Sequence, residues 1–503
     1  MISIEELANF CRRRGFVYPS SDLYGGIAGI YDYGPLGVEL KNNIKKEWWK
    51  KHVQERDEIT GIDGAIISHQ KIWEASGHLS GFSDVILECS KCKNKVRGDH
   101  FVEDHLDISA DGMKVDEINE IIKKNKLKCD KCSGELKEGS NFNLMFPVDI
   151  GASKDSKSRA YLRGETAQLI FADFKEVVGN ARLKLPFGIA QSGKAFRNEI
   201  APRNFLFRLR EFEQMEIEYF VKPGDNKCPF INDYMQHKLK VYSADMQEKN
   251  EKEKEFSIKD LLDKKIIKNE WHAFWLAHEH NWFVNLGCNG DNFRIRQHKK
   301  DELAHYSSDC WDLEYDFPFG FKEIEGIADR QDYDLQQHIK HSKQDLSLYD
   351  EESKEKIVPH VVAEPSLGVD RTFLVFMFEA YEDDEKRGNI VLKFDPRLSP
   401  VKVGVLPLVN KLNDEAKEIF DELKKEFNCF FDTSGSIGRR YARQDEAGTP
   451  FCITYDFDSR DKKDVTVRGR DSTKQIRVEI SELKDILLKL LKGKKLESFG
   501  KVN

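Results

Sequence analysis

The spacing of apolar and polar residues predicts helices in the first part of the chain. The N-terminus has the amphipathic pattern of a helix, and Ser3 with Glu6 three residues later is typical of its start. In residues 31–53, a Gly-Pro turn precedes apolar residues that recur every three to five positions. This spacing predicts a long helix with one buried stripe, which needs a partner surface.

The middle of the chain changes to a strand pattern. Residues 184–221 contain strong strand formers on both sides of a Pro-Arg-Asn turn, which favours a long antiparallel hairpin. Residues 225–268 are instead dense in Lys, Glu and Asp. That composition favours a solvated helical or flexible insertion.

The last part of the chain predicts a separate α/β domain. An apolar strand pattern follows Pro396, and helical patterns follow at 413–427 and 481–491. Residues 398–503 carry a net charge of +3, whereas the remainder carries −11. The excess of positive charge therefore lies in this predicted domain.

Composition narrows the class of protein. A length of 503 residues suggests two to four domains, and 39% hydrophobic with 11% aromatic residues excludes a disordered or fibrous chain. The net charge of −8 excludes a global basic field, so any polynucleotide must be bound locally. No apolar stretch approaches the roughly 20 residues that span a bilayer, and the N-terminus lacks a signal-peptide core. We expect a cytoplasmic protein without membrane contact.

Four of the ten cysteines form two CxxC pairs. Two such turns separated by 36 residues can present four thiolates to one tetrahedral Zn²⁺, and a full set of protein ligands closes the site to substrate. We therefore expect a structural zinc in an inserted module at 86–140; four free thiols are the alternative. The expected ligands are Cys89, Cys92, Cys129 and Cys132.

Charged side chains gather on the predicted hairpin. Because side chains alternate along a strand, Arg197 and Glu199 share one face of the first strand, and Glu216 and Glu218 share one face of the second. Such a set is expensive to bury without a charged ligand. A solvent-facing sheet with ordinary ion pairs is the alternative.

These residues resemble the signature motifs of the class II aminoacyl-tRNA synthetases. Phe-Arg-x-Glu at 196–199 and Arg-x-x-x-Phe at 208–212 match the second signature. The Gly-rich turn that ends in Arg, at 364–371, matches the third, and residues 35–66 fit the first. The signatures occur in the order that the class requires.

Within that class, the chain resembles most the homodimeric glycyl-tRNA synthetases. The matching strings include YGPLGVELKNN, YLRGETAQ, FRNEIAPR, REFEQMEIEYF, EPSLGVDR, GSIGRRYARQDEAGTPF and residues 296–335. Gly164 stands where the family usually has Pro, and Leu169 where it has Gly. These departures concern the turn that presents Glu165.

The resemblance implies an α+β fold with two domains. A class II catalytic domain at 1–396, built on an antiparallel sheet with flanking helices, would contain the zinc-knuckle insertion at 86–140 and a charged helical insertion at 225–290. An α/β anticodon-binding domain would occupy 397–503.

The resemblance also implies a glycine–tRNA ligase. Such an enzyme activates glycine with ATP and Mg²⁺ to glycyl-adenylate, transfers it to the 3′ end of tRNA(Gly), and works as a homodimer. One alternative is a catalytically inactive, nucleic-acid-binding accessory subunit. A second alternative is an enzyme that activates alanine, serine or proline. Retention of Arg197, Arg208 and Arg371 disfavours the inactive subunit.

Roles in ATP binding follow from the resemblance. Activation must neutralise two anions and stabilise negative charge that develops at the α-phosphate, and Arg197 and Arg371 are the expected catalytic residues. Phe212 and Arg371 would sandwich the adenine. The implied ATP-binding set is Arg197, Asn198, Glu199, Arg208, Phe212, Glu323, Ile324 and Arg371, with Glu211 and Glu323 as Mg²⁺ ligands.

Glycine and tRNA complete the expected sites. Glycine has no side chain, so its recognition depends on its ammonium group and on the exclusion of anything larger. The implied glycine-binding set is Glu165, Glu216, Glu364 and Ser366, with Arg97 closing over the substrate. The implied anticodon-binding set is Arg439, Arg440, Tyr441 and Arg443, which combine phosphate contacts with a stacking surface. Structural ion pairs and a solvated face are the respective alternatives.

Overall fold

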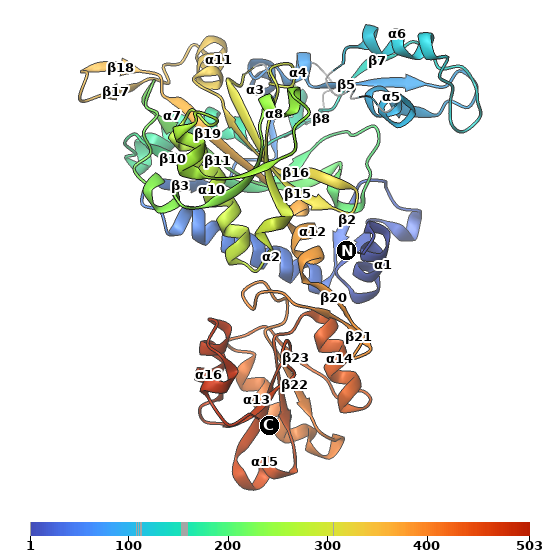
Figure 1. Cartoon of the computed structure of the whole chain (residues 1–503), viewed down its shortest axis with the longest axis vertical. Helices are drawn as coiled ribbons and strands as arrows, with labels where there is room; N and C mark the ends of the chain where they lie inside the picture. The colour runs from blue at the N-terminus through green and yellow to red at the C-terminus, as the bar shows by residue number, and fades with distance from the viewer. Residues whose placement is uncertain are drawn as a thin grey trace.

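The two largest sheets of the described residues lie in different parts of the molecule (Figure 1). The computed structural model describes residues 2–106, 108, 110, 113–151, 159–304 and 306–502. A large upper body contains most of the chain, and a smaller unit made of its last hundred residues hangs below it. No helix in the described ranges is both long and apolar enough to cross a bilayer.

The upper body is built on a mainly antiparallel sheet. Among the described residues, nine strands pair in the order β13–β12–β14–β15–β16–β19–β11–β10–β3. Their bounds are β3 Ile59–Ile62, β10 Phe187–Phe196, β11 Glu211–Val221, β12 Lys238–Tyr242, β13 Lys254–Ser257, β14 Phe293–Gln297, β15 Asp309–Phe317, β16 Gly320–Asp329 and β19 His360–Gly368. The expected antiparallel-sheet fold is confirmed; β3 with β10 and β12 with β14 are parallel pairs.

The centre of this sheet contains the predicted hairpin, β10–β11. Its register places Phe196 opposite Glu211. On the next strand, β19, Ser366 lies opposite Glu216, and on β16 Gly326 lies opposite Ser366. Residues that are far apart in sequence are therefore neighbours on one face of the sheet.

Helices cover the sheet, and two of them confirm the helices predicted from the apolar spacing. Helix α1 (Ile4–Arg14) begins with the expected Ser3–Glu6 capping box. Helix α2 (Pro35–Trp49) buries Leu40, Ile44 and Trp48 and continues into a π-helical turn. It packs against α12 (Val369–Ala380), while α7 (Ala167–Ala181) packs against β10 and β11.

The segment 225–290 differs from the expected charged helical insertion. Strands β12 and β13 belong to the main sheet, and between and after them lie α8 (Ala244–Glu248) and α9 (Ile258–Asp263). Helix α10 (Glu270–Asn285) is buried on nearly every side, with Trp271 and Trp275 in the core. The dense charge lies in residues 225–268 and ends before α10, so extending the charged insertion to residue 290 included a buried, mostly apolar helix.

The predicted cysteine-flanked module is a small lobe beside the main body (Figure 1). It has strands β5 (Ser83–Glu88), β6 (Lys95–Arg97) and β7 (Ser140–Asn143) and helices α5 (Gly98–Leu106) and α6 (Val115–Asn125). Their buried side chains form a core of their own. Other elements of the upper body are β1 Val17–Pro19, β2 Tyr31–Tyr33, β4 Ile67–His69, α3 Gln70–Ala75, α4 His78–Gly81, β8 Phe146–Asp149, β9 Arg159–Leu162, α11 Tyr333–Ser342, β17 Leu348–Asp350, β18 Glu355–Ile357, β20 Tyr381–Asp384 and β21 Asn389–Leu392.

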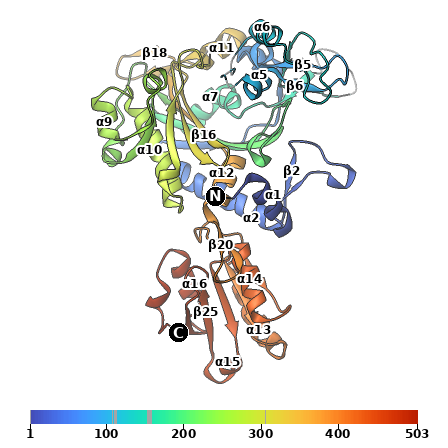
Figure 2. The same ribbon diagram turned by 45° about the vertical axis from the view of Figure 1, so that its right-hand side comes forward.

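The lower unit is the predicted α/β structure (Figure 2). Within the described chain its five strands pair in the order β23–β22–β24–β25–β26 and enclose a separate apolar core. The strands are β22 Val403–Pro407, β23 Cys429–Phe431, β24 Phe451–Tyr455, β25 Asp464–Gly469 and β26 Gln475–Glu479. The helices are α13 Asn413–Leu423, α14 Ile437–Ala447, α15 Phe457–Lys462 and α16 Leu483–Leu491.

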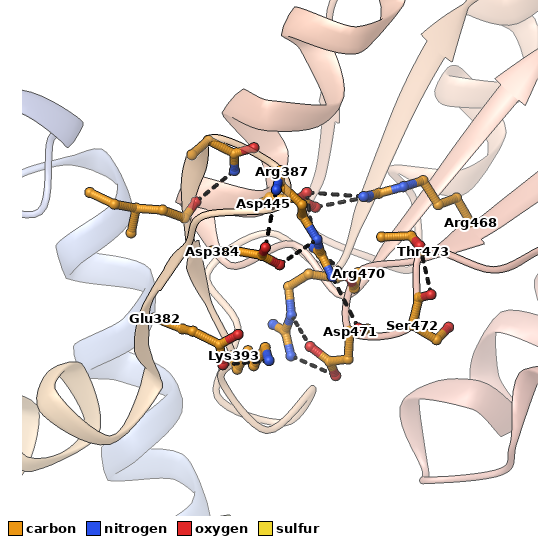
Figure 3. Close-up of polar contacts among 12 residues, drawn as sticks. Glu382, Asp384, Arg387, Lys393, Asp445, Arg468, Arg470, Asp471, Ser472 and Thr473 are labelled. Carbon is orange, nitrogen blue, oxygen red and sulfur yellow. Dashed lines mark hydrogen bonds and ion pairs between the residues drawn. The ribbon is translucent and has the colours of Figure 1, made fainter.

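A buried ionic network joins the two parts (Figure 3). Asp445 of α14 accepts hydrogen bonds from Arg468 at 2.8 and 3.0 Å and from Arg387, in the β20–β21 turn, at 3.3 Å. Arg387 also donates to the backbone carbonyl of Arg470 at 2.8 Å, and Arg470 donates to that of Phe394 at 2.7 Å. The lower unit is therefore held by buried polar contacts as well as by the connecting chain.

Replacement of Asp445 should destabilise this junction. Asp445→Ala leaves the buried Arg468 without its carboxylate, so we expect a loss of about 3–5 kcal/mol in the free energy of unfolding of the lower unit. Urea unfolding followed by circular dichroism measures the loss. The control is Asp421→Ala, because Asp421 makes exposed ion pairs with Lys417 and Lys424 that contribute little. Equal midpoints for the two variants would contradict the prediction.

Candidate functional site

The four predicted cysteines converge in the lobe. Cys89 Sγ lies 3.5 Å from Cys132 Sγ, and Cys92 Sγ lies 3.6 Å from Cys129 Sγ. Tetrahedral zinc with bonds of about 2.3 Å requires sulfur atoms about 3.8 Å apart. The backbone N–H of Cys92 also points to Cys89 Sγ at 3.5 Å, as in a metal-binding knuckle. The donor set therefore fits a closed metal site.

A buried pocket of carboxylates lies at the centre of the main sheet. Glu216 and Glu218 of β11 are 1% and 0% exposed, and Glu364 of β19 is 6% exposed. One carboxylate oxygen from each of these three side chains lies within 4.8 Å of the other two. Glu165, from the turn before α7, is also buried and contacts His78 at 3.2 Å. The three expected glycine-binding acids are thus buried, and two of them, Glu216 and Glu364, form one close group with Glu218.

Neutral and cationic groups fix the orientation of these acids. Ser366 Oγ donates to Glu216 at 2.6 Å, and the Thr166 hydroxyl donates to the other oxygen of the same carboxylate. Arg330 donates to Glu364 at 2.7 Å and to Asp334 at 2.7 and 2.9 Å. The oxygens of Glu216 are therefore directed by hydroxyls rather than neutralised by a directly paired cation.

The acids in this pocket differ in their affinity for protons. Burial raises the pKa of Glu364 to about 8, against the pull of Arg330. Burial raises the pKa of Glu216 as well, and that of Glu218 well above its ordinary range. For Glu165, burial is outweighed by His78, Arg330 and Arg197, which hold its pKa below the ordinary range. The pocket holds more carboxylates than its cations neutralise.

Several members of this pocket are absent from the expected glycine-binding set. The strand period places Glu218 on the same strand face as Glu216, but the resemblance does not assign it to glycine. Arg330 and Asp334 have the i, i+4 spacing of an ion pair. Thr166 and His78 carry no such signal, because only the tertiary fold brings them to the acids.

Arg197 and Arg371 lie on aromatic rings beside the acid pocket. Arg197 lies 5.3 Å from the Phe212 ring and 5.1 Å from the Phe82 ring, and its Nε donates to the carbonyl of Gly164 at 3.1 Å. Arg371 lies 4.5 Å from the ring of Phe207. Guanidinium groups beside aromatic rings suit stacking on a base and forked contacts with phosphate.

The remaining residues of the expected ATP set lie in the same region. Arg208 pairs with Glu199 at 2.7 Å. Burial and the nearby Asp84 raise the pKa of Glu199 to about 7. The backbone N–H of Asn198 donates to the carbonyl of Leu144, and Ile324 is 1% exposed.

The two expected Mg²⁺ ligands are held by different cations. Glu323 lies 3.2 Å from Arg371, and Glu211 pairs with Lys194. Arg97, expected to close over glycine, instead contacts Asp84 at 3.2 Å, and Asp84 lies 3.9 Å from Arg208. This geometry favours a place for Arg97 beside the Arg208–Glu199 pair over the expected contact with glycine.

The expected anticodon residues separate into two groups. Arg439 is exposed at the start of α14, whereas Arg440 is 2% exposed and donates to backbone carbonyls, including that of Leu408 at 3.3 Å. Arg443 pairs with Asp432, and Tyr441 hydrogen-bonds to Thr454. Arg440 therefore braces the lower unit from within, whereas Arg443 and Tyr441 make internal contacts but are only partly buried.

Comparisons with known proteins agree with this architecture. Residues 146–381 match the family model "tRNA synthetase class II core domain (G, H, P, S and T)", and residues 402–490 match "Anticodon binding domain". The chain is 45% identical to the glycine–tRNA ligase of Caldanaerobacter subterraneus subsp. tengcongensis, over 98% of this chain and 99% of that protein. It is 46% identical to the glycine–tRNA ligase of Bacillus thuringiensis subsp. konkukian, over 97% and 99% of the two chains.

Loss of one cysteine should empty the metal site. Cys132→Ala leaves three thiolates, so we expect the protein to lose about one zinc per chain and the lobe to become sensitive to protease. Metal analysis of protein purified without chelators measures the stoichiometry. Cys452→Ala, in the lower unit, is the control. Equal zinc in the two variants would contradict the assignment of the four cysteines.

Proposed function

The chain belongs to the glycine–tRNA ligase family, and from that premise we propose that its buried carboxylates bind glycine while its arginines bind ATP. An enzyme of this kind joins glycine to tRNA at the expense of ATP. The observation that carries the proposal is the excess of buried acid around Glu216, Glu218 and Glu364. An ammonium group supplies the positive charge that this pocket lacks.

Glu216 is the proposed centre of glycine recognition. Hydroxyl groups of Ser366 and Thr166 orient its oxygens, so the carboxylate can accept from an ammonium group without large rearrangement. Because burial raises the pKa of Glu364 to about 8, an arriving ammonium would favour release of its proton. The same side chains occupy the space where a larger amino acid would place its Cβ.

Arg197 and Arg371 are the proposed phosphate and adenine contacts. Arg197 lies between the acid pocket and the Phe212 ring, where it can stabilise negative charge that develops at the α-phosphate. Glu323, beside Arg371, is the better placed of the two Mg²⁺ candidates. Bound Mg²⁺ would neutralise phosphate charge.

In this proposal, residues 1–396 carry out catalysis and residues 397–503 bind the tRNA anticodon. Arg439 is the proposed phosphate contact in the lower unit, since it is exposed on α14. We place zinc in the four-cysteine site as a structural ion, and the reaction in the cytoplasm. The enzyme is proposed to act as a homodimer; the exposed apolar side chains Leu23 and Tyr24, 87% and 88% exposed, are compatible with a contact between copies.

Pyrophosphate exchange with each of the twenty amino acids tests the proposed function. We expect exchange with glycine and little with alanine, serine or proline. The named relatives give no support to an inactive accessory subunit. Exchange with another amino acid in place of glycine would overturn the proposal.

Arg197→Ala should lower the rate of glycine activation by about 10²-fold, because it removes a cation from the developing charge. Pyrophosphate exchange under saturating glycine and ATP is the measurement. The exposed Arg182→Ala, at the end of α7, is the matched control. A folded Arg197→Ala protein with exchange equal to that of the control would refute this role.

Ser366→Gly should weaken the discrimination between glycine and alanine. The change removes bulk opposite Glu216 and should raise the alanine-to-glycine ratio of kcat/KM by about tenfold or more. Glu216→Asp also displaces an ammonium partner, so it should lower glycine activation and shift the ratio less.

Ser192→Gly is the matched control for the Ser366 change. Ser192 lies in the same sheet but opposite Met215, and therefore on the other face from Glu216. An unchanged ratio in an active Ser366→Gly enzyme would mean that another side chain excludes alanine.

A further inference from the structure

We propose that His298, Cys310 and Asp312 form a second metal site, exchangeable and selective for Zn²⁺, on the catalytic face of the main sheet. One ligand atom from each lies within 4.8 Å of the others. The inferred effect of the bound ion, reversible inhibition of activation, rests on the proposed function. The binding of the metal does not.

Backbone geometry brings the three ligands together. Cys310 and Asp312 are two residues apart on β15 and therefore point to the same face. His298 follows β14, and its backbone N–H donates to the carbonyl of Cys310 at 3.0 Å. His298 Nε2 lies 2.7 Å from Asp312 Oδ2. Tetrahedral zinc needs about 3.4–3.8 Å between ligand atoms, so small side-chain movements would admit the ion in place of the shared proton.

The ligand chemistry favours zinc over magnesium. A thiolate and an imidazole are softer donors than the oxygen ligands that Mg²⁺ prefers. Three protein ligands also leave one coordination position open, unlike the four cysteines of the lobe. The ion would therefore exchange more readily and could bind an oxygen of a substrate or of water.

The strand register places this group beside the acid pocket. Asp312 lies opposite Gly326, and Gly326 lies opposite Ser366. Two strand spacings of about 4.8 Å place Asp312 roughly 10 Å from Ser366 on the same face. Gly326 contributes no side chain between them; a Cβ there would come within 3.8 Å of Asp312 and 4.0 Å of Glu323. No side chain of β16 therefore stands between Asp312 and Ser366 at this position.

A zinc ion at this position would disturb activation. It would draw Asp312 away from its contact with His298 and compete for Glu323, the proposed Mg²⁺ ligand. Its open position could also take a substrate carboxylate or phosphate oxygen in an unproductive arrangement. These effects predict inhibition by added zinc that a chelator reverses, while the ion in the four-cysteine site stays bound.

Cobalt titration tests the binding of metal. Protein that already holds zinc in the lobe should bind about one further Co²⁺ per chain, with the absorption of a cobalt–thiolate bond. Cys310→Ala should lose that absorption. Cys429→Ala, which removes another partly buried cysteine in the lower unit, should retain it. Absence of the band in the parent protein, or its persistence in Cys310→Ala, would overturn the proposal.

Zinc inhibition of pyrophosphate exchange tests the effect. Cys310→Ala should require at least about tenfold more zinc than the parent protein for half-inhibition, because the site has lost one ligand. Equal inhibition of both proteins would overturn the inhibitory role. Failure of the proposed function is a different result, since exchange with glycine would then be absent before zinc is added and the cobalt titration would remain informative.

Discussion

Arg330 is the side chain on which the arrangement of the catalytic face depends. It is 1% exposed, pairs with Glu364 and Asp334, and lies 3.9 Å from the ring of Tyr306. Asp334 in turn accepts from Gln168, which also donates to Glu165. One buried cation thus links β19, α11 and α7 to the acids of the pocket. Removal of such a cation would leave several buried carboxylates mutually repelling.

The pairing of Arg330 with only some of the acids explains how the pocket can be stable and still bind a cation. Arg330 stabilises the acids through Glu364 and Asp334 and does not contact Glu216, whose direct partners are hydroxyl groups. The folded protein tolerates the remaining negative charge because burial favours the protonated forms of Glu218 and Glu364. A cationic ligand can therefore bind Glu216, whose carboxylate is already oriented.

The sequence predicts the parts of this site that depend on local order. Strand alternation and the signature motifs identify Arg197, Glu216 and Arg371, and the paired cysteines identify the lobe. Only the resemblance brings Ser366 and Glu216 into one expected site, and their hydrogen bond is not predicted because it depends on the register of strands 150 positions apart. In two places the charge of the sequence did not show which residues are buried. The charged insertion expected at 225–290 includes the buried helix α10, which follows the charge-dense residues 225–268, and the basic residue Arg440 turns inward to backbone carbonyl groups that its neighbours in sequence do not reveal.

The buried network at the junction has a consequence for which RNA the enzyme can use. A ligase that contacts an anticodon and a 3′ end at once must bridge the full length of a folded tRNA. The contacts of Arg387 with Asp445 and Arg470, and of Arg470 with Phe394, restrain the orientation of the lower unit before any RNA arrives, so the entropy lost on docking is smaller than for a freely jointed pair of domains. The distance between the two parts of the enzyme is then fixed. An RNA of another length or bend would reach only one of the two parts at a time.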